Sequence, residues 1–196
     1  MDGLAGALLN AEVRAAFLAV PGAPVRLFIF EWAGPNTQNT LIPWRDITDD
    51  NSLYAIATTL ISNPRQASEV STALGQAMLF GGQVLASQGD CWRLTLDLSG
   101  DGQSNIGPRP QDIQQSLPPQ VTINAIVVGA DTGTSQGAID SEISRLTSYF
   151  RSQVIRGPNA FVEAALGFEE FETAMTRKLL KELQVLSVGN LIPATQ

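Results

Sequence analysis

The sequence of 196 residues lacks histidine altogether and contains one cysteine, Cys91. Without histidine, the chain offers neither a His-ligated zinc site nor a histidine general base. A single cysteine excludes an internal disulfide. The G-x-S-x-G motif of serine nucleophiles is missing as well, and no base is marked to activate a serine. We therefore predict that the protein is not an enzyme.

Positive charge and long apolar runs are also scarce. Twelve Lys and Arg residues are scattered along the chain against nineteen Asp and Glu, which gives a net charge of -7. Phosphate contacts need clustered basic side chains, so we expect no nucleic-acid partner. No apolar run approaches the ~20 residues of a membrane span, so we expect no membrane insertion. The hydrophobic content of 44% is that of a globular protein.

What the sequence does contain is an alternation of strand and helix patterns. The predicted strands cover residues 24–32, 39–44, 91–99, 121–130 and 159–165. The predicted helices cover residues 3–19, 46–63, 68–87, 134–153 and 168–183, with a short helix or turn at 108–117. This alternation predicts an α/β fold with a doubly wound, mostly parallel sheet between helices. We expect one domain over residues 1–184 and a flexible tail over 185–196.

The most informative stretch is LTLDLSGDGQSN, residues 94–105, where a strand runs into a polar loop. Asp97, Ser99 and Asp101 alternate there, as in a calcium loop, but Pro108 stands where an EF-hand needs glutamate. No lysine follows the glycines, which excludes a phosphate-binding loop. The pair Asp97 and Asp101 would also suit a hydrolase, which is a weaker alternative.

Two interpretations of this loop remain open. Thr72, at the start of a predicted helix, and Asp101, at the end of a strand, could both contribute oxygens to a magnesium site. Alternatively, Ser71 or Thr72 caps the helix, and Asp101 and Gly102 form a turn. Trp32 and Trp44 are best explained by packing, although both residues also suit the rim of a partner-binding surface.

Four stretches resemble successive motifs of the bacterial family called domain of unknown function 1194, which is similar to von Willebrand factor A domains. They are FEWAGPNTQNTLIPW, STALGQAM, DLSGDGQSNIG and VIRGPNAFVEAA followed by FEEFETAMTRKLLKEL. The resemblance covers nearly the whole chain. It implies a three-layer, Rossmann-like α/β fold in which the first central strand, expected between residues 24–32 and 92–99, is absent.

The resemblance also implies a metal-ion-dependent adhesion site built by three loops. Thr72 matches the second loop and Asp101 the third, whereas the first loop, Asp-x-Ser-x-Ser, is missing. We therefore expect no cofactor in this chain, and Mg²⁺ where the full site is restored. The implied function is protein–protein binding through Thr72, Ser99, Asp101 and Asp97.

The missing strand leads to further expectations about partners and location. Buried backbone groups without partners are costly, so the neighbouring strands pair, another chain donates a strand, or the natural protein continues upstream. Oligomerisation or scaffolding through strand edges is thus the alternative function. An upstream signal peptide would make the protein periplasmic or secreted, whereas a chain complete as given would be cytoplasmic.

Overall fold

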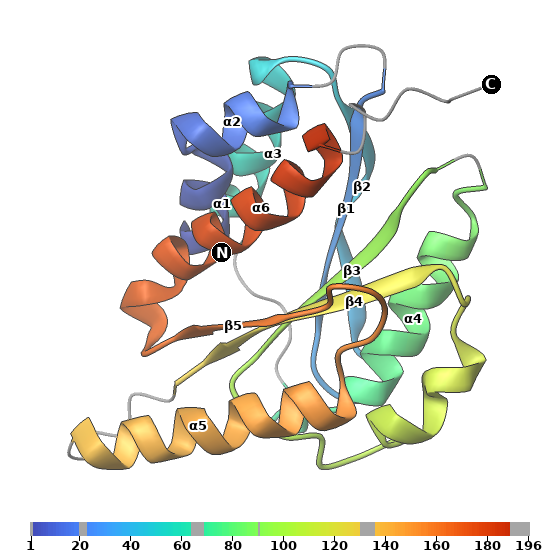
Figure 1. Cartoon of the computed structure of the whole chain (residues 1–196), viewed down its shortest axis with the longest axis vertical. Coiled ribbons are helices and arrows are strands. Elements are labelled where there is room, and N and C mark those ends of the chain that lie inside the picture. The colour runs from blue at the N-terminus through green and yellow to red at the C-terminus, as the bar shows by residue number, and fades with distance from the viewer. Residues whose placement is uncertain (1, 20–22, 64–68, 90, 130–135, 189–196) are drawn as a thin grey trace. The chain divides into compact units, whose positions relative to one another are not determined.

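The computed structural model describes residues 2–19, 23–63, 69–89, 91–129 and 136–188, and it is shown in Figure 1. These residues belong to two compact units. The first combines Met1–Phe30, Thr40–Arg65 and Phe171–Gln196, and the second combines Glu31–Asn39 with Gln66–Glu170. Each unit is described by itself.

Helices dominate the first unit. They are α1 (Asp2–Leu9), α2 (Ala11–Phe17), α3 (Asp50–Ser62) and α6 (Phe171–Val188). α1 packs against α3 and α6, and α2 also contacts α6. The contact with α6 is so close that a Cβ atom on Gly3 would lie 2.8 Å from the Phe171 ring. Glycine on α1 therefore permits the two helices to approach.

The predicted helix at residues 3–19 is broken at Asn10. The Asn10 side chain accepts hydrogen bonds from the backbone N–H groups of Glu12 (2.9 Å) and Val13 (3.3 Å), which makes it the N-cap of α2. Asparagine caps a helix better than it continues one, because its side chain competes for backbone donors. The apolar spacing correctly predicts helical structure here, but this cap divides one predicted helix into two.

Strands β1 (Val25–Trp32) and β2 (Gln38–Ile47) form a two-stranded sheet. Only five residues, 33–37, connect them, and a connection this short joins antiparallel strands. β2 extends three residues beyond the predicted end at residue 44. Pro43 is exposed within this strand. Proline is tolerated there because, among the described strands, β2 pairs only with β1, and its other edge needs no donor.

The second unit contains a three-stranded parallel sheet in the order β3-β4-β5. Its strands are β3 (Leu94–Gly100), β4 (Val121–Val128) and β5 (Val162–Ala165). All eight residues of β4 are buried, as its apolar sequence predicted for a central strand. The parallel β3-β4-β5 sheet with its helices confirms a mixed α/β fold.

Two helices accompany this sheet. α4 (Leu74–Ala86) contacts β3 and the 3₁₀ helix η1 (Pro110–Ser116), and α5 (Gln136–Gln153) contacts β4 and β5. Because the three strands are parallel, their carboxyl ends share one edge of the sheet. The residues that follow β3 and β5 lie at this edge, whereas residues 130–135, which follow β4, lie outside the described residues.

Several boundaries differ from the prediction. Phe168, the first residue of the last predicted helix, lies in the 3₁₀ helix η2 (Phe168–Glu170) and is 62% exposed. α6 begins only at Phe171 and runs to Val188, while the tail beyond, residues 189–196, lies outside the described residues. Met175 and Leu179 on α6 are buried, whereas Phe171 at its start is half-buried.

Candidate functional site

The candidate site is formed by two loops of the second unit. Thr72 lies in the segment that precedes α4, and Asp101 directly follows the last residue of β3. Ser99 is the penultimate residue of that strand and is half-buried. Asp101 is exposed and Thr72 is half-buried. The strand therefore delivers Ser99 and Asp101 to the carboxyl edge of the sheet, as predicted.

Hydrogen bonds join the two loops. The Thr72 carbonyl accepts from the backbone N–H of Asn105 (3.0 Å) and from the Ser104 hydroxyl (3.2 Å), and the Thr72 N–H donates to the Asn105 side-chain oxygen (2.8 Å). A Cβ atom placed on Gly102 would lie 3.9 Å from Thr72 Oγ1. The fold thus brings Thr72 against the loop that carries Asp101.

This arrangement corrects one interpretation of the sequence. α4 begins at Leu74, its N-cap position is Ala73, and no side chain caps the helix by a hydrogen bond. Neither Ser71 nor Thr72 is the cap, because the backbone of Thr72 is engaged by the loop at residues 104–105 instead. The explanation of Thr72 as a helix cap is therefore wrong.

Close packing holds the second half of the β3–η1 loop in place. Gly75 in the first turn of α4 faces the Pro108 carbonyl so closely that any Cβ atom would overlap it. The Tyr149 hydroxyl accepts a hydrogen bond of 3.3 Å from the Ser104 backbone N–H. These contacts hold Ser104 and Pro108 in place, whereas the first residues of the loop, Asp101 and Gly102, lie at the surface.

Three oxygen-bearing groups at this edge have no hydrogen-bond partner in the part of the chain that is described. They are the hydroxyls of Thr72 and Ser99 and the carboxylate of Asp101. Polar side chains left open in this way are available to an external ligand. Asp97, the fourth predicted residue, is exposed on β3 opposite Asn124, and its side chain is already engaged in an interaction.

The donor set fits magnesium in type but not in number. Mg²⁺ prefers six hard oxygen ligands in octahedral geometry, and one carboxylate with two hydroxyls supplies three of these oxygens and a single negative charge. Among the described residues, no group of three or more His, Cys, Asp or Glu side chains comes together to hold a metal ion. Thr72 and Asp101 could therefore hold a cation only with additional ligands.

Sequence reasoning missed the residues that assemble these loops. Glu69 accepts hydrogen bonds from Thr37 Oγ1 (2.5 Å) and Ser71 Oγ (3.3 Å), and the Ala73 N–H donates to the Ala33 carbonyl (2.8 Å). The β1–β2 turn is thus tied to the segment that carries Thr72. Asn105 could have indicated this arrangement from the sequence, because asparagine side chains in loops commonly form hydrogen bonds with backbone groups.

The two tryptophans are placed separately. Trp44 is half-buried in β2, and its ring lies 5.5 Å from the ring of Phe28 on β1, which is the packing role predicted for it. Trp32 is half-buried at the end of β1. Trp44 belongs to the first unit and Trp32 to the second. Their role at a partner-binding rim stays a prediction.

The family model described as "Protein of unknown function (DUF1194)" matches residues 1–187. The chain belongs to the DUF1194 family. Searches of curated proteins and of solved structures found no match for this DUF1194 chain. Within the residues described, none of its helices has both the length and the apolar character required to cross a membrane.

Proposed function

We propose that this DUF1194 protein is a non-enzymatic protein-binding domain of the adhesion type, with an incomplete metal-ion-dependent site. The observation that carries the proposal is the juxtaposition of two loops with open oxygens at the carboxyl end of β3. In parallel α/β sheets this edge is where ligands bind. Thr72, Ser99 and Asp101 are the residues that contact the partner.

The proposed fold is that of a von Willebrand factor A domain without its first central strand. Two facts support it. β1 and β2 form a sheet of their own, and β3 is the terminal strand of the other sheet. The resemblance places the absent strand between β1 and β3. Among the described strands, β1 and β3 are each a terminal strand of their sheet, which is compatible with a missing strand beside each of them.

In the complete site, Thr72 and Asp101 would hold Mg²⁺ together with oxygens from the missing first loop. A bound Mg²⁺ would supply a Lewis-acid centre able to take a partner's carboxylate as its last ligand. In this chain, the same side chains bind a partner through hydrogen bonds: the hydroxyls of Thr72 and Ser99 donate, and the carboxylate of Asp101 accepts.

A photo-crosslinking residue at exposed Gln103 tests the binding role. In cells that naturally produce the protein, we expect one discrete adduct, because Gln103 directly follows the Asp101–Gly102 turn. Asp101→Asn should abolish it, since the amide preserves the size of the side chain but removes its charge. The matched control carries the crosslinker at exposed Gln115 on η1. An adduct that persists in Asp101→Asn, or that forms equally from Gln115, would contradict the proposal.

Metal soaking tests the incompleteness of the site. Crystals exposed to Mg²⁺ or Mn²⁺ should show no ordered ion between Thr72 and Asp101, because a single carboxylate attracts the hydrated ion too weakly to hold it in one place. Asp101→Ala serves as the control, since it removes the one carboxylate. A well-occupied octahedral ion in the unchanged protein that disappears in Asp101→Ala would show that the site is complete.

The alternative function is a structural subunit that docks through strand edges. β3 and β5 are the terminal strands of the parallel sheet, which is the observation that favours it. Hydrolysis by Asp97 and Asp101 is the weaker alternative. The chain contains no histidine to pair with them, and its described part holds no cluster of three or more metal-ligating side chains.

A further inference from the structure

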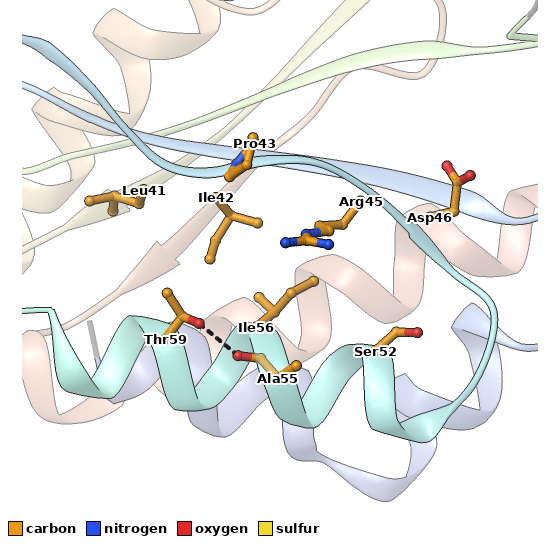
Figure 2. Close-up of a pocket in the computed structure, with 9 residues that line it drawn as sticks. All are labelled: Leu41, Ile42, Pro43, Arg45, Asp46, Ser52, Ala55, Ile56 and Thr59. Atoms are coloured by element: carbon orange, nitrogen blue, oxygen red, sulfur yellow. Dashed lines mark hydrogen bonds between the residues drawn. The ribbon is translucent and has the colours of Figure 1, made fainter.

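A groove with a volume of about 300 Å³ opens between β2 and α3 in the first unit. Its inner wall is apolar. Ile42 on β2 and Ile56 on α3 are 4% and 3% exposed, and Leu41 and Ala55 extend this surface outward. Figure 2 shows the side chains of Ile42 and Ile56 facing each other from the strand and the helix. The groove involves none of the residues of the candidate site at the end of β3.

One cation projects into this groove. The Arg45 side chain leaves β2 and lies between the strand and α3, beside Ile42 and Ile56 (Figure 2). Two other arginines of this unit are paired: Arg14 contacts Asp50 at 2.7 Å, and Arg26 contacts Asp46 at 2.5 Å. Arg45, in contrast, makes no ion pair or hydrogen bond within the described residues.

The remaining polar groups of the groove already have partners. The charge of Asp46 is compensated by Arg26. The Thr59 hydroxyl donates to the Ala55 carbonyl (2.9 Å), and the Ser52 hydroxyl donates to Asp49 Oδ1 (2.6 Å). The strong hydrogen-bond donor that remains is the guanidinium of Arg45. An anionic group next to an apolar chain is the chemistry that complements this surface.

We propose that the groove binds a small monocarboxylate with an aliphatic chain. The Arg45 guanidinium receives the carboxylate, for which its planar donors are suited in a bidentate geometry. The aliphatic chain lies over Ile42 and Ile56, and this contact removes part of the chain's own apolar surface from water. The volume is at the small end of ligand pockets and suits a chain of roughly six to ten carbons.

Titration of the ¹⁵N-labelled chain with sodium octanoate at constant ionic strength tests this proposal. Saturable shifts are expected for backbone amides of residues 41–46 and 52–59, with little change elsewhere. Arg45→Gln should weaken binding about tenfold or more, as expected for loss of a charged hydrogen bond. Arg145→Gln, which changes an exposed arginine of α5, is the matched control and should bind octanoate like the unchanged protein.

Uncharged 1-octanol separates the role of the carboxylate from that of the apolar wall, and it should bind more weakly than octanoate. The absence of saturable shifts up to about 10 mM octanoate would overturn the proposal, because that affinity is too weak for a specific site. Equal binding by Arg45→Gln and the unchanged protein would overturn it too. An unchanged amide spectrum of Arg45→Gln outside β2 and α3 establishes that the variant is folded.

Discussion

At the scale of single residues, the environment of each polar side chain decides its role. Asp49 and Asp101 are both aspartates in loops next to secondary structure. Asp49 is the N-cap of α3 and accepts hydrogen bonds from the Ser52 hydroxyl and backbone N–H. Asp101 has no such bond within the described residues. One carboxylate is consumed by the fold, and the other is available for binding.

Asp49 yields a prediction about pH. The Ser52 hydroxyl, and then the Ser52 backbone N–H, lower the pKa of Asp49 below its ordinary value of 3.8. Because the folded pKa is the lower one, the charged cap stabilises the fold above pH 3.8, and this contribution is lost as the pH falls through the folded pKa. We expect the urea midpoint of the protein, relative to that of Asp49→Asn, to decrease over this acidic range.

Ser52→Ala provides the control for this pH dependence. It removes the hydroxyl, which is the largest cause of the lowered pKa, and retains the backbone donor. In Ser52→Ala, the decrease of the urea midpoint at acidic pH should therefore be smaller. It is measured relative to the double variant that carries both Ser52→Ala and Asp49→Asn. A difference in urea midpoint between the unchanged protein and the Asp49→Asn variant that is the same at neutral and acidic pH would show that the Asp49 charge contributes nothing to stability.

At the scale of elements, the loop between β3 and η1 is shaped by the start of α4. Glycine is a poor helix former, so helix propensity alone would favour alanine at position 75 by up to about 1 kcal/mol. The Pro108 carbonyl occupies the space that the Cβ atom of alanine would need. The contact between α4 and the loop therefore outweighs the preference of the isolated helix.

Gly75→Ala should destabilise the protein by about 1–3 kcal/mol, because the added atom meets backbone that cannot rotate away. Urea denaturation measures the change, and amide shifts at Thr72 and Asn105 report displacement of the loop. Gly89→Ala is the control, since no atom of the described residues, apart from those of its chain neighbours, lies within 4 Å of a Cβ atom placed there. It should change stability by less than about 0.5 kcal/mol. Equal stability of the two variants would contradict the proposed steric role.

At the scale of the whole molecule, charge bears on association. The net charge of -7 opposes self-association at low ionic strength, because identical chains repel each other. Strand edges favour association, since an unpaired edge can accept a strand from another chain. If charge repulsion is the stronger effect, the protein is a monomer, as expected of the binding domain. If strand pairing is the stronger effect, the protein associates, as expected of the scaffold subunit.

We expect a monomer of 20.9 kDa in sedimentation equilibrium at micromolar concentration. A protein whose role is to bind a different partner through Asp101 has no need to bind itself. The measurement is repeated at high salt, where charge repulsion is screened. A stable dimer under both conditions would instead favour the scaffold function, in which a second chain occupies a strand edge.

Local patterns were sufficient to predict most elements. The apolar run of residues 121–130 predicted a strand buried on both faces, and β4 is that strand. Aspartate is a residue type that favours the N-cap position, and Asp49 is the N-cap of α3. Errors arose where a local pattern was overruled, as at Asn10, which divides a helix, and at Thr72, whose backbone bonds to a distant loop rather than capping α4.

The sequence by itself determined the α/β class, the absence of histidine chemistry and the residues that carry oxygens after β3, because these depend on composition and on short-range periodicity. The tertiary structure alone decided that Thr72 lies against the loop of Asp101, with its hydroxyl beside Gly102. It also decided that Arg45 faces an apolar groove. Such arrangements depend on hydrogen bonds and packing between segments far apart in the chain, which no local pattern encodes.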